Sequence, residues 1–122
     1  IWAAWLSDST TSPLMRFKID GGPYKLLNEA RIANDFADLT DAMLALPIGL
    51  TEIMSPGNKF SVWTGTAPGG AASVMGDFCL DWTAAGTIGS ATYGFTLDVA
   101  NGWTETQTVP CDVSFHLYCF EQ

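Results

Sequence analysis

The residues of this chain best suited to chemistry are three cysteines, Cys79, Cys111 and Cys119, and a single histidine, His116. A thiol can act as a nucleophile beside a histidine, ligate zinc or form a disulfide. The chain has no Cys-x2-Cys pair and no histidine cluster, so the common zinc patterns are excluded. Three buried, reduced thiols are one interpretation of the odd count. A disulfide-containing extracellular domain is the preferred one.

Carboxylate catalysis and metal binding have less support. Asp77 and Asp81 would serve a glycosidase only if one were an acid of raised pKa in a cleft, and nothing in the sequence indicates a cleft. The acids between residues 35 and 41 have the helical spacing of a solvated face, and no Asp-x-Asp-x-Asp calcium loop is present. His116 fits a structural histidine on a strand. We therefore expect no enzyme activity, no catalytic residues, no metal and no cofactor.

Composition and charge indicate a packed domain that avoids polyanions. The 122 residues suit one domain, and 48% of them are hydrophobic while 15% are charged. The net charge is −8, and all five basic residues precede residue 60. Such a chain repels phosphate backbones and anionic lipid, and no apolar run is long enough to span a membrane. We expect neither nucleic acid nor membrane insertion.

Short elements connected by polar loops are predicted along the chain. Phe36, Leu39 and Met43 have the spacing of a buried helix face, so a helix is expected over 35–44 with Asn34 as its N-cap. Turn composition indicates loops at 7–13, 20–23 and 67–73 and a turn at Ser55-Pro56-Gly57-Asn58. Short strands are expected at residues 2–6, 14–19, 24–27, 31–33 and 60–63, and the alternation of a hairpin is present at 92–97.

The closing segment alternates in a way that predicts a strand. Phe115, Leu117 and Cys119 would point to one side, and His116, Tyr118 and Phe120 to the other. Because both sides carry aromatic residues, we expect a central strand and not an edge strand.

Several motifs in the second half of the chain together resemble a known family. They are Val62-Trp63-Thr64-Gly65, the Cys-x-x-Trp motif at 79–82, a Gly/Ala/Ser-rich loop, and Cys-x7-Cys at 111–119 in an apolar terminal segment. This order resembles the endostatin domain of collagens, and still more the related, uncharacterised bacterial surface domains that end in Leu-Tyr-Cys-Phe-Glu. The resemblance implies an α+β, C-type-lectin-like fold over residues 1–122, with a mixed, mostly antiparallel sheet, a short helix and long loops.

The resemblance also bears on the cysteines. A disulfide between Cys79 and Cys111 would tie the Cys-x-x-Trp turn to the start of the last strand, as their positions around the loop suggest. Related domains pair the last cysteine with one in a helix that precedes the first strand. Here that helix would lie upstream of Ile1, so Cys119 is expected to be a free thiol or to have its partner in a missing N-terminal helix of a longer secreted protein. The family's zinc-binding histidines, the arginines used for heparin and the lectin calcium motifs are missing.

Recognition through a loop is the function that these features favour. Folds of this group present a long irregular loop on a rigid base. The stretch 84–110 would be this loop, with candidate ligand-binding residues at Tyr93, Asn101, Trp103, Glu105 and Gln107. Trp103 could stack on a sugar ring, or it could pack beneath the loop as a core residue, whereas Trp63 and Trp82 are expected in the core.

The predicted protein is a secreted or cell-surface, extracellular module for recognition or adhesion. Its partner would be a glycan or protein on another cell, bound from the tip of a surface protein or fibre. One alternative is a structural C-terminal cap or oligomerisation domain, such as a trimer within a fibre, with no small ligand. A second alternative is a hydrolase, because the fold alone does not exclude one.

Overall fold

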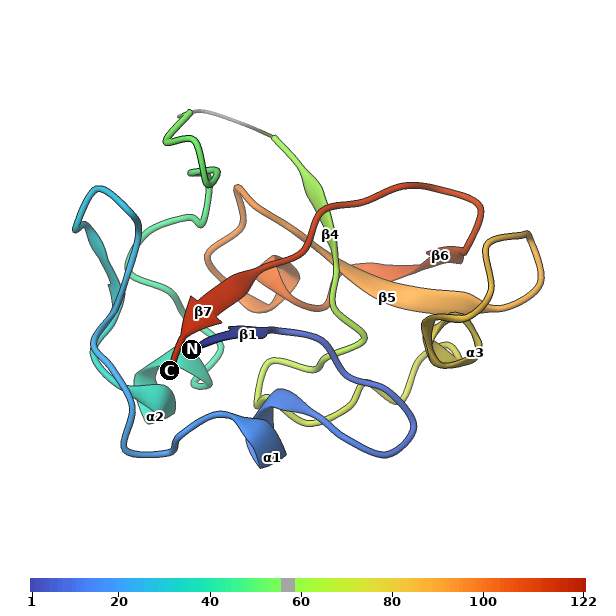
Figure 1. Ribbon diagram of the computed structural model, residues 1–122, viewed down its shortest axis with the longest axis horizontal. Helices are drawn as coiled ribbons and strands as arrows, with labels where there is room; N and C mark the ends of the chain where they lie inside the picture. Colours follow the sequence, from blue (N-terminus) through green and yellow to red (C-terminus); the bar gives the residue numbers. More distant parts are fainter. Residues whose placement is uncertain (56–58) are drawn as a thin grey trace.

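The computed structural model describes residues 1–55 and 59–122, and the turn predicted at Ser55-Pro56-Gly57-Asn58 lies mostly outside the described residues. The described residues form short helices and three small antiparallel sheets, an α+β arrangement (Figure 1). The strands are β1 (Trp2–Ala4), β2 (Tyr24–Lys25), β3 (Arg31–Ala33), β4 (Ser61–Trp63), β5 (Ser90–Phe95), β6 (Gln107–Pro110) and β7 (Cys119–Glu121). The helices are α1 (Pro13–Arg16), α2 (Phe36–Leu39), α3 (Phe78–Trp82) and the 3-10 turn η1 (Asn101–Trp103).

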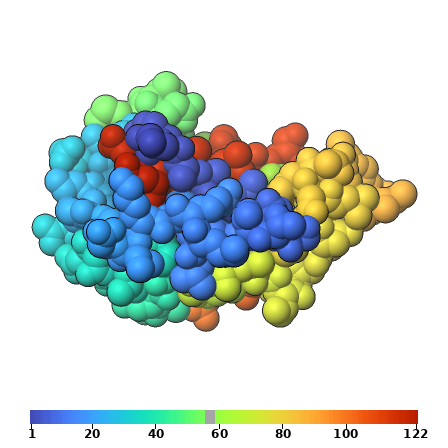
Figure 2. Space-filling view, turned by 60° about the horizontal axis from the view of Figure 1, so that its bottom comes forward, coloured from blue at the N-terminus to red at the C-terminus, as the bar shows by residue number. Residues whose placement is uncertain are grey.

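The two ends of the chain are paired in one sheet. Strand β1 runs antiparallel to β7, with Ala3 opposite Phe120. Figure 2 shows the two ends, blue and red, lying against each other, while the yellow segment around α3 projects at the other end of the molecule. The first strand was correctly predicted, although it is shorter than expected.

The central sheet is β4-β5-β6, and it shows that the predicted long loop is largely regular structure. Strand β5 pairs with β4 on one side and with β6 on the other. Both β5 and β6 lie within 84–110, so this stretch is not one irregular loop. Small and β-branched residues make β5 a good middle strand, because Thr and Ala pack closely between neighbours.

Two predictions in the first half of the chain are wrong in detail. Helix α2 ends at Leu39, is capped by the Asp35 side chain instead of Asn34, and leaves Met43 exposed. Residues 14–19 do not form a strand: α1 begins at Pro13, whose fixed φ suits the first turn of a helix. Only for residues 14–19 was the type of element wrong, because the pattern was too short to distinguish the periods of helix and strand.

The closing segment is also not a central strand. His116 exchanges hydrogen bonds with β4, since its N–H donates to Ser61 O at 3.2 Å and its carbonyl accepts from Trp63 N–H at 3.0 Å. Beyond it, β7 pairs only with β1 among the described strands. Of the two predicted faces, Tyr118 and Phe120 are buried, whereas Leu117 and Cys119 are exposed. The segment therefore connects two sheets and has only one core face at β7.

The main core is aromatic and lies between the β1-β7 sheet and the central sheet. Trp5 and Trp103 are fully buried with ring centroids 4.9 Å apart, and Tyr118 and Phe120 pack against them. The two indoles differ in their hydrogen bonding: Trp5 Nε1 donates to Thr104 Oγ1 at 2.7 Å, whereas Trp103 Nε1 is buried without a hydrogen-bond partner among the described residues. The remaining buried members of this cluster are Phe17, Tyr24, Ile32, Ala33, Phe36, Leu39, Leu44 and Val62.

Candidate functional site

A row of partly exposed aromatic rings covers the outer face of the central sheet. Trp63 of β4 and Tyr93 of β5 are directly opposite in the register. Phe115, in the segment that returns along β4, lies between them, with its ring 4.7 Å from that of Trp63 and 5.3 Å from that of Tyr93. Trp82 continues the row at 5.7 Å from Trp63. We call these four residues the aromatic face.

The aromatic face exists because side chains alternate along β4. Val62 points into the core and is 1% exposed, whereas its neighbour Trp63 points to the opposite side and is partly exposed. Trp63 and Trp82 pack against the small second cluster around the disulfide, and not in the main core. The prediction that both are core residues is therefore correct only in part: each covers the disulfide with one side and meets solvent with the other.

Two of the sequence-predicted site residues belong to this surface. Gln107 of β6 lies opposite Tyr93, and its Nε2 donates to the Tyr93 hydroxyl at 3.0 Å. Gln107 is exposed and Tyr93 is partly exposed. The pair places an amide and a phenol at the edge of the row of rings, where both can exchange hydrogen bonds with a ligand.

The other three predicted residues lie elsewhere. Trp103 is fully buried against Trp5, so of the two alternatives predicted for it the core residue is correct and the ligand-stacking ring is wrong. The chain can pack it there because Gly94 has no Cβ, and a Cβ at that position would overlap the carbonyl oxygen of Trp103. Asn101, at the start of η1, is exposed, while Glu105 is partly buried.

One end of the aromatic face is built by an unusual turn. From Phe78 to Trp82, α3 has positive φ at every residue, and Cys79, Leu80 and Asp81 have the dihedrals of a left-handed helix. For residues with a Cβ this conformation costs roughly 1–2 kcal/mol each. Surrounding contacts must therefore hold the turn.

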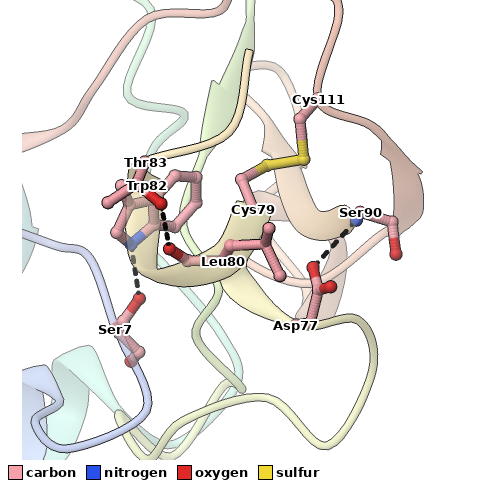
Figure 3. Close-up of a disulfide and its surroundings, with 8 residues drawn as sticks. All are labelled: Ser7, Asp77, Cys79, Leu80, Trp82, Thr83, Ser90 and Cys111. Carbon is pink, nitrogen blue, oxygen red and sulfur yellow. Dashed lines mark hydrogen bonds between the residues drawn. A yellow bond between two sulfur atoms is a disulfide. The ribbon is translucent and has the colours of Figure 1, made fainter. Parts of the chain in front are cut away.

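Three attachments hold this turn, and Figure 3 shows two of them (the disulfide and the Trp82 bond). Cys79 forms the predicted disulfide with Cys111, with an S–S distance of 2.07 Å and a Cα–Cα distance of 5.7 Å. Trp82 Nε1 donates to the Ser7 carbonyl at 2.9 Å. The Asp81 carboxylate accepts from the Ser9 N–H at 2.7 Å and from its hydroxyl at 2.6 Å. The turn thus orients Trp82 toward Trp63.

The histidine and the free cysteine, which could take part in catalysis or metal binding, do not form a site with other such residues among those described. His116 is exposed and its ring packs at a tilt against that of Phe60, with ring centroids 4.0 Å apart. Cys119 is a free, exposed thiol. In residues 1–55 and 59–122 no three His, Cys, Asp or Glu side chains group as a metal site. Within the same ranges, no helix is long and apolar enough to cross a membrane.

The arrangement is suited to recognition of a surface with an apolar side. Aromatic rings supply contact area at little conformational cost, because each has only two rotatable side-chain bonds. Trp63, Trp82 and Phe115 were not predicted to be surface residues. A signal for Trp63 was present: it alternates with Val62, and pairing of β4 with the 92–97 strand would set it beside Tyr93.

Comparison of the chain with family models, with curated proteins and with solved structures gave no match.

Proposed function

We propose that the chain is an extracellular recognition or adhesion module, with the C-type-lectin-like fold that its motifs resemble, and that the aromatic face binds neutral glycans. The observation that carries the proposal is the row of Trp63, Phe115, Tyr93 and Trp82 with the Tyr93–Gln107 pair beside it. The aromatic face thus replaces the 84–110 loop as the proposed ligand-binding surface. The disulfide supports an oxidising, extracellular location.

The chemistry of the surface favours sugars over charged ligands. The C–H face of a pyranose is apolar and can pack on an aromatic ring, while its hydroxyls need donors and acceptors at the ring's edge. Tyr93 and Gln107 provide both. From Phe60 to Gln122 the chain has no Lys or Arg, so anionic polymers would find no counter-charge here.

Affinity for one domain is expected to be low. The row is open and the contact small, so we expect a Kd between about 0.1 and 1 mM, or roughly 4–6 kcal/mol. Adhesion by such a domain would depend on several copies displayed together, which raises the effective affinity without any new contact.

A glycan array tests the proposal. The domain is presented in multivalent form as wild type, as Tyr93→Ala and as Trp2→Ala. Trp2 is the matched control because it is 60% exposed but is not part of the aromatic face. We expect Tyr93→Ala to lose the glycans that the wild type binds and Trp2→Ala to keep them. Equal binding by all three proteins would contradict the proposed surface.

The structural alternative, a cap or oligomerisation domain, has one supporting observation. Val74 is 99% exposed, Ile88 78% and Leu80 51%, and hydrogen bonds between Asp77 and Ser90 join the segments that carry them. Light scattering decides this point: a stable dimer or trimer that Val74→Lys dissociates would favour the cap.

A further inference from the structure

A large groove lies along β7, away from the aromatic face. Its volume is about 970 Å³. One wall is the closing segment, from His116 to Glu121, and the other is formed by residues 23–29 and 48–52. No residue of the aromatic face lines it. The groove is therefore a second candidate surface, and the proposed glycan binding does not use it.

The floor of this groove is the open edge of a strand. Trp5 N–H donates to the Tyr118 carbonyl at 2.9 Å, and Gln122 N–H donates to the Ile1 carbonyl at 2.7 Å. Antiparallel pairs alternate between hydrogen-bonded and non-hydrogen-bonded positions, so the backbone groups of Cys119 and Glu121 point away from β1. Among the described strands, none pairs with β7 on that side. The Glu121 carbonyl accepts a long hydrogen bond from Gln122 Nε2 at 3.3 Å, and a carbonyl oxygen can accept a second one. Both residues can therefore pair with an added strand.

The walls are apolar and the rim is acidic. Leu27 is 46% exposed and Leu117 51%, so both present apolar surface to the groove. Glu52 and Glu121 line it, and among the described residues no basic side chain forms an ion pair with either, whereas Lys25 is held by Glu29 at 2.8 Å. A ligand with apolar groups and positive charge would complement both features.

We propose that the groove along β7 binds an extended polypeptide segment of a partner protein as an additional strand. Backbone N–H and C=O groups of that segment would pair with Cys119 and Glu121. Alternate side chains would then point toward the apolar walls, and the intervening Lys or Arg residues toward the carboxylates. A free strand edge requires a partner with regularly spaced backbone donors and acceptors, and this requirement selects a peptide over a sugar or a lipid.

Cys119 provides a reporter for occupancy, because its exposed thiol lies in the groove. The rate of its reaction with a maleimide is measured with and without the peptide acetyl-Lys-Val-Lys-Val-Lys-Val-amide at about 1 mM. Bound peptide covers the thiol, so at a concentration of about three times Kd the reaction slows about fourfold. There are two control peptides. One has Glu in place of each Lys, and the other has N-methyl groups on the backbone amides that would pair with β7.

We expect protection by the Lys peptide alone. A Glu52→Lys, Glu121→Lys double variant should reverse the preference, so that the Glu peptide protects Cys119 better than the Lys peptide. Tyr93→Ala should leave protection unchanged, because Tyr93 does not line the groove. Equal protection by the N-methylated peptide would overturn the proposal, since strand pairing would then contribute nothing. Absence of protection by the Lys peptide would overturn it as well.

Discussion

The molecule contains two tryptophan pairs with opposite surroundings. Trp5 and Trp103 are fully buried, and the hydroxyls of Thr104 and Tyr118 bond to the Trp5 indole and the Trp103 carbonyl. Trp63 and Trp82 are partly exposed, and they lie on a disulfide instead of in the main core. The first pair is therefore committed to stability. The second retains free ring surface, which is the property a binding site requires.

The difference follows from what lies on each side of the central sheet. The inner face of β4 and β5 meets Trp103 and the buried threonines, while the outer face is partly covered by the returning segment with Phe115 and by α3. A sheet with one thinly covered face leaves large side chains at intermediate exposure. Substitutions on the two faces should consequently affect different properties.

The largest effect is expected in the buried pair. Trp103→Ala should lower the free energy of unfolding by about 3–5 kcal/mol, because it leaves a cavity beside Trp5. Trp2→Ala removes a ring of the same type that is 60% exposed, so it should change stability by less than about 0.5 kcal/mol. Urea unfolding of both variants is the measurement. Similar midpoints for the two would contradict the assignment of Trp103 to the core.

The disulfide is expected to have the next largest effect. Replacing Cys79 and Cys111 together by Ser removes a link across 32 residues and should cost about 3–4 kcal/mol in the chain-entropy model. The left-handed turn loses its tether as well, so amide exchange at Thr83 and Ala84, whose N–H groups donate to the Cys79 carbonyl, should accelerate first. Cys119→Ser, at an exposed free thiol, is the control and should melt like the wild type.

A smaller loss of stability is expected on the aromatic face. Trp63→Ala removes a ring that is only partly buried, so we expect a cost of about 1–3 kcal/mol and a folded protein at room temperature. Glycan binding should be abolished in the same variant, because the ring lies in the middle of the row. A folded variant with unchanged binding would separate Trp63 from the site.

The smallest effect is a dependence on high pH that arises in the core. Burial raises the pKa of the Tyr118 phenol above its ordinary value, and Asp98 raises it further. The unfolded chain then releases this proton near pH 10 while the folded chain retains it, so stability is complete below about pH 10 and falls above it by at most ~1.4 kcal/mol per pH unit.

Tyr118→Phe tests this dependence, although it also removes the hydrogen bond to the Trp103 carbonyl. The variant should be less stable than the wild type near neutral pH, and the difference should narrow as the pH rises past about 10. Urea unfolding at several pH values is the measurement. A constant difference across that range would show that Tyr118 does not retain its proton in the folded protein.

Local sequence signals predicted the parts of the fold that depend on neighbours in sequence. The strands at Trp2 and Trp63, the buried Phe36 and Leu39 of α2, and the link between Cys79 and Cys111 are all present. The resemblance contributed to the cysteine assignment, and the structure supports its coarse consequence, an α+β fold with antiparallel sheets.

The features that were missed depend on tertiary contacts. The left-handed turn from Phe78 to Trp82 contains no glycine, so the local sequence gives no sign of it. It is held by the disulfide and by hydrogen bonds to Ser7 and Ser9, which are distant in sequence. Trp103 was placed among ligand-binding candidates because its surroundings are small and polar in sequence. Its burial depends on Gly94, which is nine residues away and on another element. No local pattern could separate these alternatives.

Footprinting of the bound domain tests most directly the claim that the aromatic face is the recognition surface. The domain is labelled with hydroxyl radicals, free and bound to the glycan that the array identifies, and modification is read at each aromatic residue by mass spectrometry. We expect Trp63, Tyr93 and Phe115 to lose most of their labelling on binding, while Trp2 keeps its labelling. Unchanged labelling of Trp63 and Tyr93 in the bound domain would contradict it.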